Sequence, residues 1–458
     1  MAAPSFAQLD EQPIKRFHWL AIFTTGMGVF TDGYDLSSIG IVLPLVLTSF
    51  GIAKVSSIQG AGLAGSALVG AAIGALLFGF LAQGGRKKFY GIDVTLMAIA
   101  AIAQIFVGSI WALIVVRFIL GIGVGADYVL SPTIMAEHAN RRDRGRKIGL
   151  GFGVMWSSGA LAAALLTLIL ESAGVGPGMV WRIVLAFGAV PALSVLYLRR
   201  KMPETARFLA RLADDQEGAA AVVQRVSGEH AALLPSKDDR PFGAVFAQHA
   251  RPIFATALLW MVFDIVAYSG TLFGPSLIAK GLGLSATTFS IGMSVLFGLP
   301  GALVAALLLI DRLGRKPLQG YGFLGAGIML ILFAGLHQSV LAVPALGFVL
   351  YGLYTLALAG PNIVSGTGIL GVELAPTRVR TIGQAISVAG GRIGASLTAF
   401  LFPLIFARTG VVGAIYTMAG FSILGAILTR VLIPETAGRS LEELNRDVEV
   451  VAVKAAAG

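Results

Sequence analysis

Residues 111–137 read WALIVVRFILGIGVGADYVLSPTIMAE, an apolar run that contains Arg117 and Asp127 and ends on Glu137. About 20 apolar residues suffice for a helix to cross the roughly 30 Å of hydrocarbon in a bilayer. The run therefore predicts a membrane-spanning helix. Because an ionisable side chain at the centre of the membrane costs about 2.5–3.5 kcal/mol, each charge inside the run needs a structural or functional reason.

Eleven other runs have the same character. Together the twelve runs place spans near 18–48, 57–82, 90–110, 111–137, 147–170, 181–199, 251–279, 286–310, 318–336, 340–370, 381–407 and 411–433. The mean hydropathy of the 458-residue chain is +0.83, and 13% of its residues are charged, against roughly 25% in soluble domains. We predict an all-α integral membrane protein with twelve transmembrane helices.

Lysine and arginine are distributed unequally between the two ends of these spans. Of the 34 residues, two lie inside spans, and four lie in loops on the side opposite the N-terminus: Lys54, Arg182, Lys280 and Arg408. All the others fall on the side of the N-terminus. Because cytoplasmic loops retain positive charge, we expect a multi-pass protein of the cell membrane with both termini in the cytoplasm. This distribution explains the net charge of +10 without a nucleic-acid partner.

Short motifs of the first half recur in the second at a nearly constant offset. Pro203-Glu204-Thr205-Ala206 recurs as Pro434-Glu435-Thr436-Ala437, and Gly85-Arg86-Lys87 recurs as Gly314-Arg315-Lys316. Two pairs of acidic residues repeat in the same register, Glu137 with Glu373 and Asp32 with Asp264. Such a pattern indicates a duplicated unit, as in many secondary transporters.

The repeat predicts how the chain is divided. Two six-helix halves, 1–200 and 251–433, are expected to surround a central cavity. A polar cytoplasmic linker at 201–250 separates the halves, and a cytoplasmic tail follows at 434–458.

Five ionisable residues are expected near the middle of the membrane: Asp32, Asp35, Asp127, Asp264 and Arg392. Any one of them has a structural explanation as part of a buried ion pair. However, four carboxylates cannot all pair with one guanidinium, so some of them must exchange protons. We therefore predict a proton-coupled carrier in which these four carboxylates, with Arg117 nearby, take part in proton coupling.

Aromatic residues accompany these carboxylates. Trp260, Asp264 and Tyr268 are four residues apart and share one helix face, and Tyr128 adjoins Asp127. For a lone tryptophan or tyrosine, packing against lipid or the core is the ordinary explanation. Their alignment with an acidic residue in mid-span indicates a binding site.

The loop motifs suggest a gate. Glu137, Asp311, Arg315 and Glu373 lie at span ends, where acids face arginine-rich loops. We expect these residues to hold the two halves together in one state of the carrier. The alternative is that the arginines only fix topology.

Taken together, these motifs resemble those of the major facilitator superfamily. Asp311-Arg312-Leu313-Gly314-Arg315-Lys316 is similar to its loop motif between spans 8 and 9, and Arg117-x3-Gly121-x-Gly123 is similar to its span 4 motif. The segments 202–209 and 434–444 resemble motifs of sugar porters. The equivalent first-half loop, 79–87, departs from the pattern and has Gln83 where the family has an acid.

Within that superfamily the chain resembles the phosphate:proton symporters most closely. The resemblance is carried by the segments 30–36, 126–131, 260–268, 360–362 and 390–394. It implies a phosphate site lined by Tyr128, Trp260, Asp264, Tyr268, Asn362 and Arg392, with Asp32, Asp35 and Asp127 as proton carriers. The sequence has Arg392 where that family has lysine, and Trp156 where it has glutamine.

The predicted function is proton-coupled uptake of inorganic phosphate or a similar small anion by alternating access. Trp156 adds a flat apolar surface, and Asp32-Gly33-Tyr34-Asp35 resembles a motif of aromatic-acid:proton symporters. An organic or aromatic acid is therefore the alternative substrate. A sugar fits less well, because few amides lie in mid-span to replace the water of a neutral polyol.

Other classes of protein fit the sequence poorly. A nutrient-sensing receptor is an alternative, but the short tail offers no signalling domain. The sequence has no cysteine, and none of its histidines is in mid-span. We therefore expect no catalytic residue, metal site or cofactor, and a monomer whose partners are the anion, protons and membrane lipid.

Overall fold

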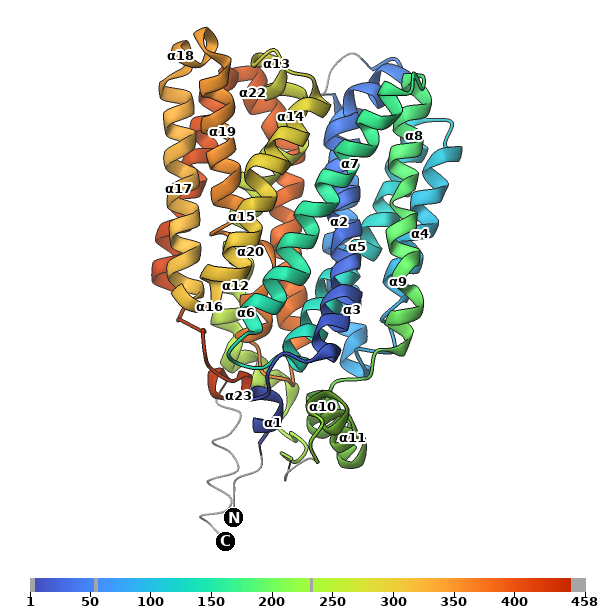
Figure 1. Ribbon diagram of the computed structural model, residues 1–458, viewed down its shortest axis with the longest axis vertical. Coiled ribbons are helices and arrows are strands. Elements are labelled where there is room, and N and C mark those ends of the chain that lie inside the picture. The colour runs from blue at the N-terminus through green and yellow to red at the C-terminus, as the bar shows by residue number, and fades with distance from the viewer. Residues whose placement is uncertain (1–4, 53–56, 231–233, 446–458) are drawn as a thin grey trace.

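The computed structural model describes residues 5–52, 57–230 and 234–445, all within or between helices (Figure 1). Lys54, the tail beyond 445 and the first four residues lie outside the described residues. The long helices run side by side along one axis. Helices α1 (Ala7–Asp10) and α23 (Leu441–Leu444) lie at the same end of the bundle, which we call the α1/α23 end.

Short π or 3-10 turns interrupt several of the long helices. In chain order the bundle contains α2 (Arg16–Ser49); α3 (Ile58–Leu81) with η1 (Ala82–Gly84); α4 (Ile92–Ala103) with η2 (Gln104–Phe106); α5 (Ile110–His138); α6 (Arg144–Ile148), η3 (Gly149–Val154) and α7 (Met155–Ser172); α8 (Pro177–Phe187) and α9 (Ala189–Lys201); α12 (Phe242–Phe273), η5 (Gly274–Ile278) and α13 (Ala279–Gly281); α14 (Ala286–Met293), η6 (Ser294–Gly298), α15 (Leu299–Val304), η7 (Ala305–Leu309) and α16 (Ile310–Leu313); α17 (Arg315–Gly335); α18 (His337–Ala342), α19 (Pro344–Ala359), α20 (Ile363–Gly366) and α21 (Ile369–Glu373); and α22 (Arg380–Leu432).

The number of spans agrees with the sequence pattern. Among the described residues, nine segments are long and apolar enough to cross a membrane, and two shorter apolar helices lie at 92–106 and 344–359. Helix α22 is interrupted at Gly410, whose backbone is left-handed (φ 67°, ψ −174°), so this one segment forms two spans. The twelve expected spans are thereby accounted for.

Glycines set how closely the helices of the first half approach. A Cβ atom on Gly121 of α5 would lie 2.0 Å from the Ala67 carbonyl oxygen of α3, and one on Gly125 would lie 2.0 Å from the Ala71 carbonyl oxygen. Only glycine permits such contact between two backbones. The glycine-spaced motif that follows Arg117 is therefore a packing surface for α3.

The two sets of six spans stand side by side (Figure 1). Helix α3 packs along α22, and α2 packs against α12. At the end opposite α1 and α23, a Cβ atom on Gly40 would lie 2.3 Å from the Thr271 carbonyl oxygen, and the Thr287 hydroxyl donates to Glu171 at 3.1 Å. The sets are thus in contact at both ends of the bundle.

A small group of helices lies outside the bundle at the α1/α23 end. It consists of α1, α10 (Ala206–Phe208), η4 (Leu209–Ala213), α11 (Gln216–Ser227) and α23. Phe6 and Leu9 of the N-terminal arm are buried against α10 and α11. The linker between the two sets is therefore folded onto the arm that precedes the first span.

Candidate functional site

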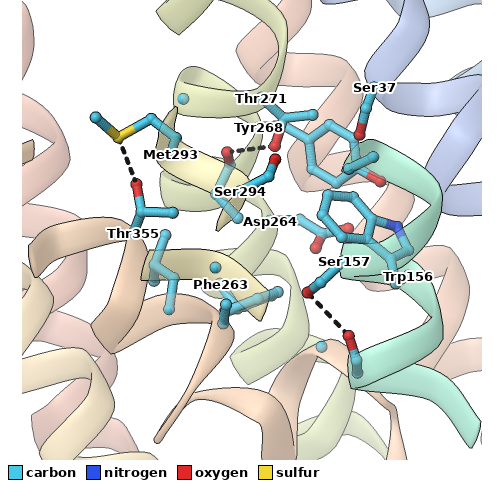
Figure 2. Close-up of a pocket in the computed structure, with 18 of the residues that line it drawn as sticks. Ser37, Trp156, Ser157, Phe263, Asp264, Tyr268, Thr271, Met293, Ser294 and Thr355 are labelled. Carbon is cyan, nitrogen blue, oxygen red and sulfur yellow. Dashed lines mark hydrogen bonds between the residues drawn. The ribbon is translucent and has the colours of Figure 1, made fainter. Parts of the chain in front are cut away.

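A cavity of about 190 Å³ lies between the two sets of spans. Residues of α2, α5, α7, α12, α14, α19 and α22 line it. Figure 2 shows Trp156 and Ser37 on one side, Met293 and Thr355 on the other, and Asp264 and Tyr268 between them. Both halves of the chain therefore contribute to a single chamber.

Arg392 of α22 is the cation of this cavity. Its Nη1 donates to Tyr268 at 2.6 Å and to Asp264 at 3.1 Å, and its side chain is only 2% exposed. The guanidinium carbon lies 4.2 Å from the centre of the Tyr128 ring. The Nε atom is buried and has no hydrogen-bond partner among the described residues. At the wall of a cavity, a guanidinium with spare donor capacity is chemically suited to an oxyanion.

Trp260 supports this arginine from α12. Its ring centre lies 6.0 Å from that of Tyr128 and 6.0 Å from the guanidinium carbon. A Cβ atom on Gly391 would lie 2.6 Å from the indole, and one on Gly368 would lie 2.4 Å away. These two glycines leave the space that the indole occupies beside Arg392.

Two carboxylates of α2 lie buried, and no cation of the described residues pairs with their oxygens. Asp32 is fully buried, and neither of its oxygens has a hydrogen-bond partner in the described chain. Asp35 is also buried, and its Oδ2 likewise lacks a partner within residues 5–52, 57–230 and 234–445. Arg117 donates to the Asp35 backbone carbonyl at 3.2 Å rather than to the carboxylate.

Asp127 does have a cation, which corrects an assumption of the sequence analysis. Arg199, near the end of α9, pairs with Asp127 at 2.7 Å and with Asp93 of α4 at 2.5 Å. The Ser131 hydroxyl donates to the same Asp127 oxygen at 2.5 Å. Arg199 had been counted among the cytoplasmic loop residues, but its guanidinium is fully buried among these acids. Arg392 is thus not the sole cation available to the carboxylates within the spans.

Glu137 is the centre of an ion-pair cluster at the α1/α23 end. It contacts Arg86 at 3.1 Å from its own half and Arg380 at 2.7 Å from the other half, and it accepts a hydrogen bond from Thr205. All of these side chains are buried. Gln83 crosses between the halves at the same end, donating to Thr381 at 2.7 Å.

Glu373 is the centre of a second cluster with the same plan. It contacts Arg315 at 3.2 Å from its own half and Arg144 at 2.7 Å from the other, and it accepts from Thr436 at 2.6 Å. Asp311 pairs with Arg315 at 2.8 Å and accepts two backbone N–H bonds from Gly145 and Arg146 of the other half, at 3.0 and 2.6 Å.

A third cluster joins the arm, the linker and the tail. Arg207 of α10 contacts Asp10 at 2.8 Å and Glu442 of α23 at 2.7 Å. Burial raises the pKa of Asp10 to about 6, although Arg207 opposes that shift. Burial would also raise the pKa of Glu442, but the Arg207 guanidinium outweighs burial and lowers it. Arg207 is thus paired with two carboxyl groups whose pKa values are shifted in opposite directions.

The comparisons with known proteins agree with this architecture. The family model described as sugar (and other) transporter matches residues 20–448. The chain belongs to the sugar (and other) transporter family. It is 33% identical to a probable inorganic phosphate transporter 1-6 of Arabidopsis thaliana, over 97% of each chain. It is 35% identical to a probable inorganic phosphate transporter 1-10 of Oryza sativa subsp. japonica, over 96% of this chain and 91% of the relative.

Solved structures of the same fold come from the major facilitator superfamily. The proton:xylose symporter XylE bound to 6-bromo-6-deoxy-D-glucose superposes with a TM-score of 0.77 at 22% identity, covering 94% of this chain and 98% of XylE. A partially occluded inward-open form of XylE from E. coli gives a TM-score of 0.74 at 21% identity, covering 92% and 99%. The predicted fold class is therefore confirmed.

The structure brings most of the predicted site residues of this transporter together. Six of them line the cavity: Tyr128, Trp156, Trp260, Asp264, Tyr268 and Arg392. Asn362 is buried but is not among the lining residues, and both polar atoms of its side chain lack a partner in the described chain. Its predicted place in the substrate site stays a prediction.

Sequence reasoning missed three residues. Arg199 and Asp93 complete the cluster around Asp127. Ser37 lines the cavity, and its buried hydroxyl has no partner among the described residues. Ser37 lies on α2 in the same span as Asp32 and Asp35, so the acidic pair was the available signal.

Proposed function

We propose that this transporter couples inward proton movement to the uptake of inorganic phosphate, or a small anion of similar shape, across the cell membrane. The observation that carries the proposal is the geometry of Arg392, a buried guanidinium at the cavity wall with tyrosines and one carboxylate around it. The relatives with 33–35% identity over almost the whole chain are named inorganic phosphate transporters, which supports phosphate as the anion.

Asp264 is the link between anion and proton in this proposal. It already shares the Arg392 guanidinium at 3.1 Å. A phosphate on the same guanidinium would place a second negative charge beside it, and two like charges in a dry site repel strongly. Binding therefore requires that Asp264 takes a proton or shares one with the anion. Anion and proton then cross the membrane together.

Asp32 is the proposed carrier of a further proton. A charged carboxylate that is fully buried without a partner is costly, so Asp32 is expected to be neutral in the conformation described. Asp127, which Arg199 holds, packs against the same helix, since a Cβ atom on Gly28 of α2 would lie 2.2 Å from the Asp127 Oδ2 atom. A rearrangement that brings Arg199 or water to Asp32 would release its proton.

Alternating access follows from the contacts between the halves. We assign the α1/α23 end to the cytoplasm, because the arginine-rich loops gather there. The Glu137 and Glu373 clusters hold this end closed through Arg380 and Arg144. They must separate when the cavity opens to the cytoplasm, and we expect the carrier to do this as a monomer in lipid.

The test is uptake of radiolabelled phosphate into proteoliposomes with an imposed proton gradient. We expect accumulation that collapses with a protonophore and is competed by phosphate-like anions but not by glucose. Sulfate and benzoate serve as the other competitors. Absence of phosphate uptake in vesicles shown to be intact would contradict the proposal.

An aromatic acid is the second candidate substrate, and one observation favours it. Trp156 lines the cavity beside Asp264 and offers an indole face to the substrate (Figure 2). Benzoate that outcompetes phosphate in the same vesicles would identify this second function.

A further inference from the structure

The cavity has two unlike sides. Arg392, Tyr268 and the unpartnered Ser37 hydroxyl lie toward the α2 and α22 side. The wall formed by α14, η6 and α19 is instead lined by Phe289, Met293, Tyr351 and Leu358, which we call the apolar wall. Figure 2 shows Met293 and Thr355 across Asp264 from Trp156.

Three hydroxyl groups at or beside this wall, two on α14 and α19 and one on the adjoining α12, already donate within their own helices. The Thr355 hydroxyl donates to the Tyr351 carbonyl at 3.0 Å, the Ser290 hydroxyl to the Ala286 carbonyl at 2.8 Å, and the Thr271 hydroxyl to the Ala267 carbonyl at 3.1 Å. These bonds stay within one helix turn. The wall therefore offers a ligand mainly apolar surface, and an ion surrounded by oxygen loses hydration there without compensation.

The apolar wall is also well ordered by ring contacts. The Phe289 and Tyr351 ring centres are 5.6 Å apart, and those of Tyr351 and Tyr354 are 5.0 Å apart. Phe289 is 2% exposed and Tyr351 is 3% exposed, so both rings are fixed by their neighbours. Rigid aromatic edges of this kind favour another ring or alkyl group.

The volume allows such a group beside the anion. The cavity measures about 190 Å³. An apolar cavity of roughly 150 Å³ in another protein holds a benzene molecule. A single ring is thus the largest apolar group that a cavity of this size would accommodate.

We propose that the apolar wall is a second subsite, which takes an apolar group attached to the phosphorus of the bound anion either directly or through an ester oxygen. The substrate class is then organic: phosphonates or phosphate monoesters that carry an aryl or short alkyl substituent. Inorganic phosphate would fill only the Arg392 side. This inference rests on the proposed function, because it needs the oxyanion to bind at Arg392.

The first test measures binding without a gradient, as ligand-induced thermal stabilisation of the purified carrier by phosphate, methylphosphonate and phenylphosphonate. We expect phenylphosphonate to bind at least about tenfold more tightly than methylphosphonate, since it buries a ring. Equal binding of the two phosphonates would overturn the subsite. Benzoate that binds as tightly as phenylphosphonate would overturn the assignment to phosphorus oxyanions.

Matched variants test the position of the subsite. Ser294→Phe fills the space at the apolar wall. The control, Val295→Phe, adds the same ring at the next residue, which is 46% exposed on the outside of the bundle. We expect Ser294→Phe to bring the ratio of phenylphosphonate to methylphosphonate affinity close to one, and Val295→Phe to leave it unchanged. Thr355→Leu fills the same space from α19 if Ser294→Phe does not fold. A ratio unchanged in a folded filling variant would overturn the proposal.

Uptake separates this failure from failure of the proposed function. If phosphate accumulates with the proton gradient while both phosphonates bind alike, only the subsite is wrong. If the parent does not accumulate phosphate in intact vesicles, the proposed function itself fails.

Discussion

The two halves of the molecule are alike at the α1/α23 end and unlike in the middle of the membrane. At that end each half supplies a buried glutamate, its own loop arginine and a threonine: Glu137, Arg86 and Thr205 in the first half, and Glu373, Arg315 and Thr436 in the second. In mid-membrane the first half carries an excess of carboxylates, while the second carries the Arg392–Asp264 pair. The two halves thus share the contacts at the α1/α23 end but differ in the charged residues in the middle of the membrane.

The charged groups of the two halves differ, and this difference suggests a different role for each half. The second half holds a cation that faces the cavity and suits an anion. The first half holds Asp32 without a partner in the described chain, and Asp127 beside Arg199. In this account the second half binds the anion together with one proton at Asp264, and the first half carries a further proton at Asp32.

The largest expected effect comes from removing the cation of the first half. Arg199→Gln leaves Asp93 and Asp127 buried with no cation between them, which costs about 3–5 kcal/mol. We expect a large drop in melting temperature and loss of transport. The neighbouring Arg200→Gln, whose side chain is exposed, serves as the control. Stability like that of the parent would mean that Arg199 is not the balancing charge.

The corresponding change in the second half is Arg392→Ala. It removes the donor to Asp264 and Tyr268, and losing one partner of a buried charge pair at a binding site costs about 2–5 kcal/mol. We expect phosphate binding to be lost, as measured by ligand-induced thermal stabilisation. Arg430→Ala, on the same helix but exposed, should bind like the parent. Retained binding in Arg392→Ala would break the assignment of the anion to the second half.

The loop of each half that contacts the other half gives a smaller, graded test. Asp311 accepts two backbone N–H bonds across the interface and pairs with Arg315, whereas Gln83 makes one neutral hydrogen bond. Bonds to charged groups contribute about 1.5–3 kcal/mol and neutral ones about 1 kcal/mol. Asp311→Asn should therefore open the α1/α23 end more than Gln83→Ala does.

Spin labels measure that opening directly. The sequence has no cysteine, so labels on cysteines introduced at the exposed Lys88 and Arg312 report a distance without background. A larger population of long distances in Asp311→Asn than in Gln83→Ala is expected. The reverse order would show that the first-half loop carries the gate.

The smallest effect concerns pH and the arm. Because burial raises the pKa of Asp10 to about 6, its contribution to stability is full at low pH and is lost as the pH rises through 6. Asp10→Asn removes this dependence. The measured quantity is the melting temperature of the variant minus that of the parent. We expect this difference to be larger at pH 7.5 than at pH 5. A difference between variant and parent that is the same at both pH values would contradict the shift.

The fold and the ion-pair contacts of Glu137 and Glu373 were predictable for different physical reasons. Hydrocarbon thickness fixes span length, so hydropathy alone placed the twelve spans, including the two joined in α22. The constant offset of the repeated motifs predicted that Glu137 and Glu373 occupy equivalent places in the two halves. In a duplicated chain, residues that occupy equivalent places in the two halves recur at a constant offset in the sequence.

The charge balance of the first half was not predictable in this way. Arg199 lies two residues before the end of its helix and counted as a topology residue, yet its long side chain reaches into the span. Its partner Asp93 lies in the first turn of α4, and no sequence motif pointed to it. The reach of the Arg199 side chain, rather than its helix position, decides this cluster. Asn362 shows the converse, because resemblance placed it at the substrate whereas the cavity lining does not include it.

Asp32→Asn tests the central division of labour most directly. In proteoliposomes, exchange of external for internal phosphate needs binding and alternating access but no net proton movement, whereas accumulation against a concentration gradient needs coupling. The account predicts that Asp32→Asn keeps exchange within about threefold of the parent and accumulates much less phosphate, because only the proton at Asp264 still drives uptake. Accumulation equal to the parent would contradict the assignment of proton movement to the first half, and so would loss of exchange together with accumulation.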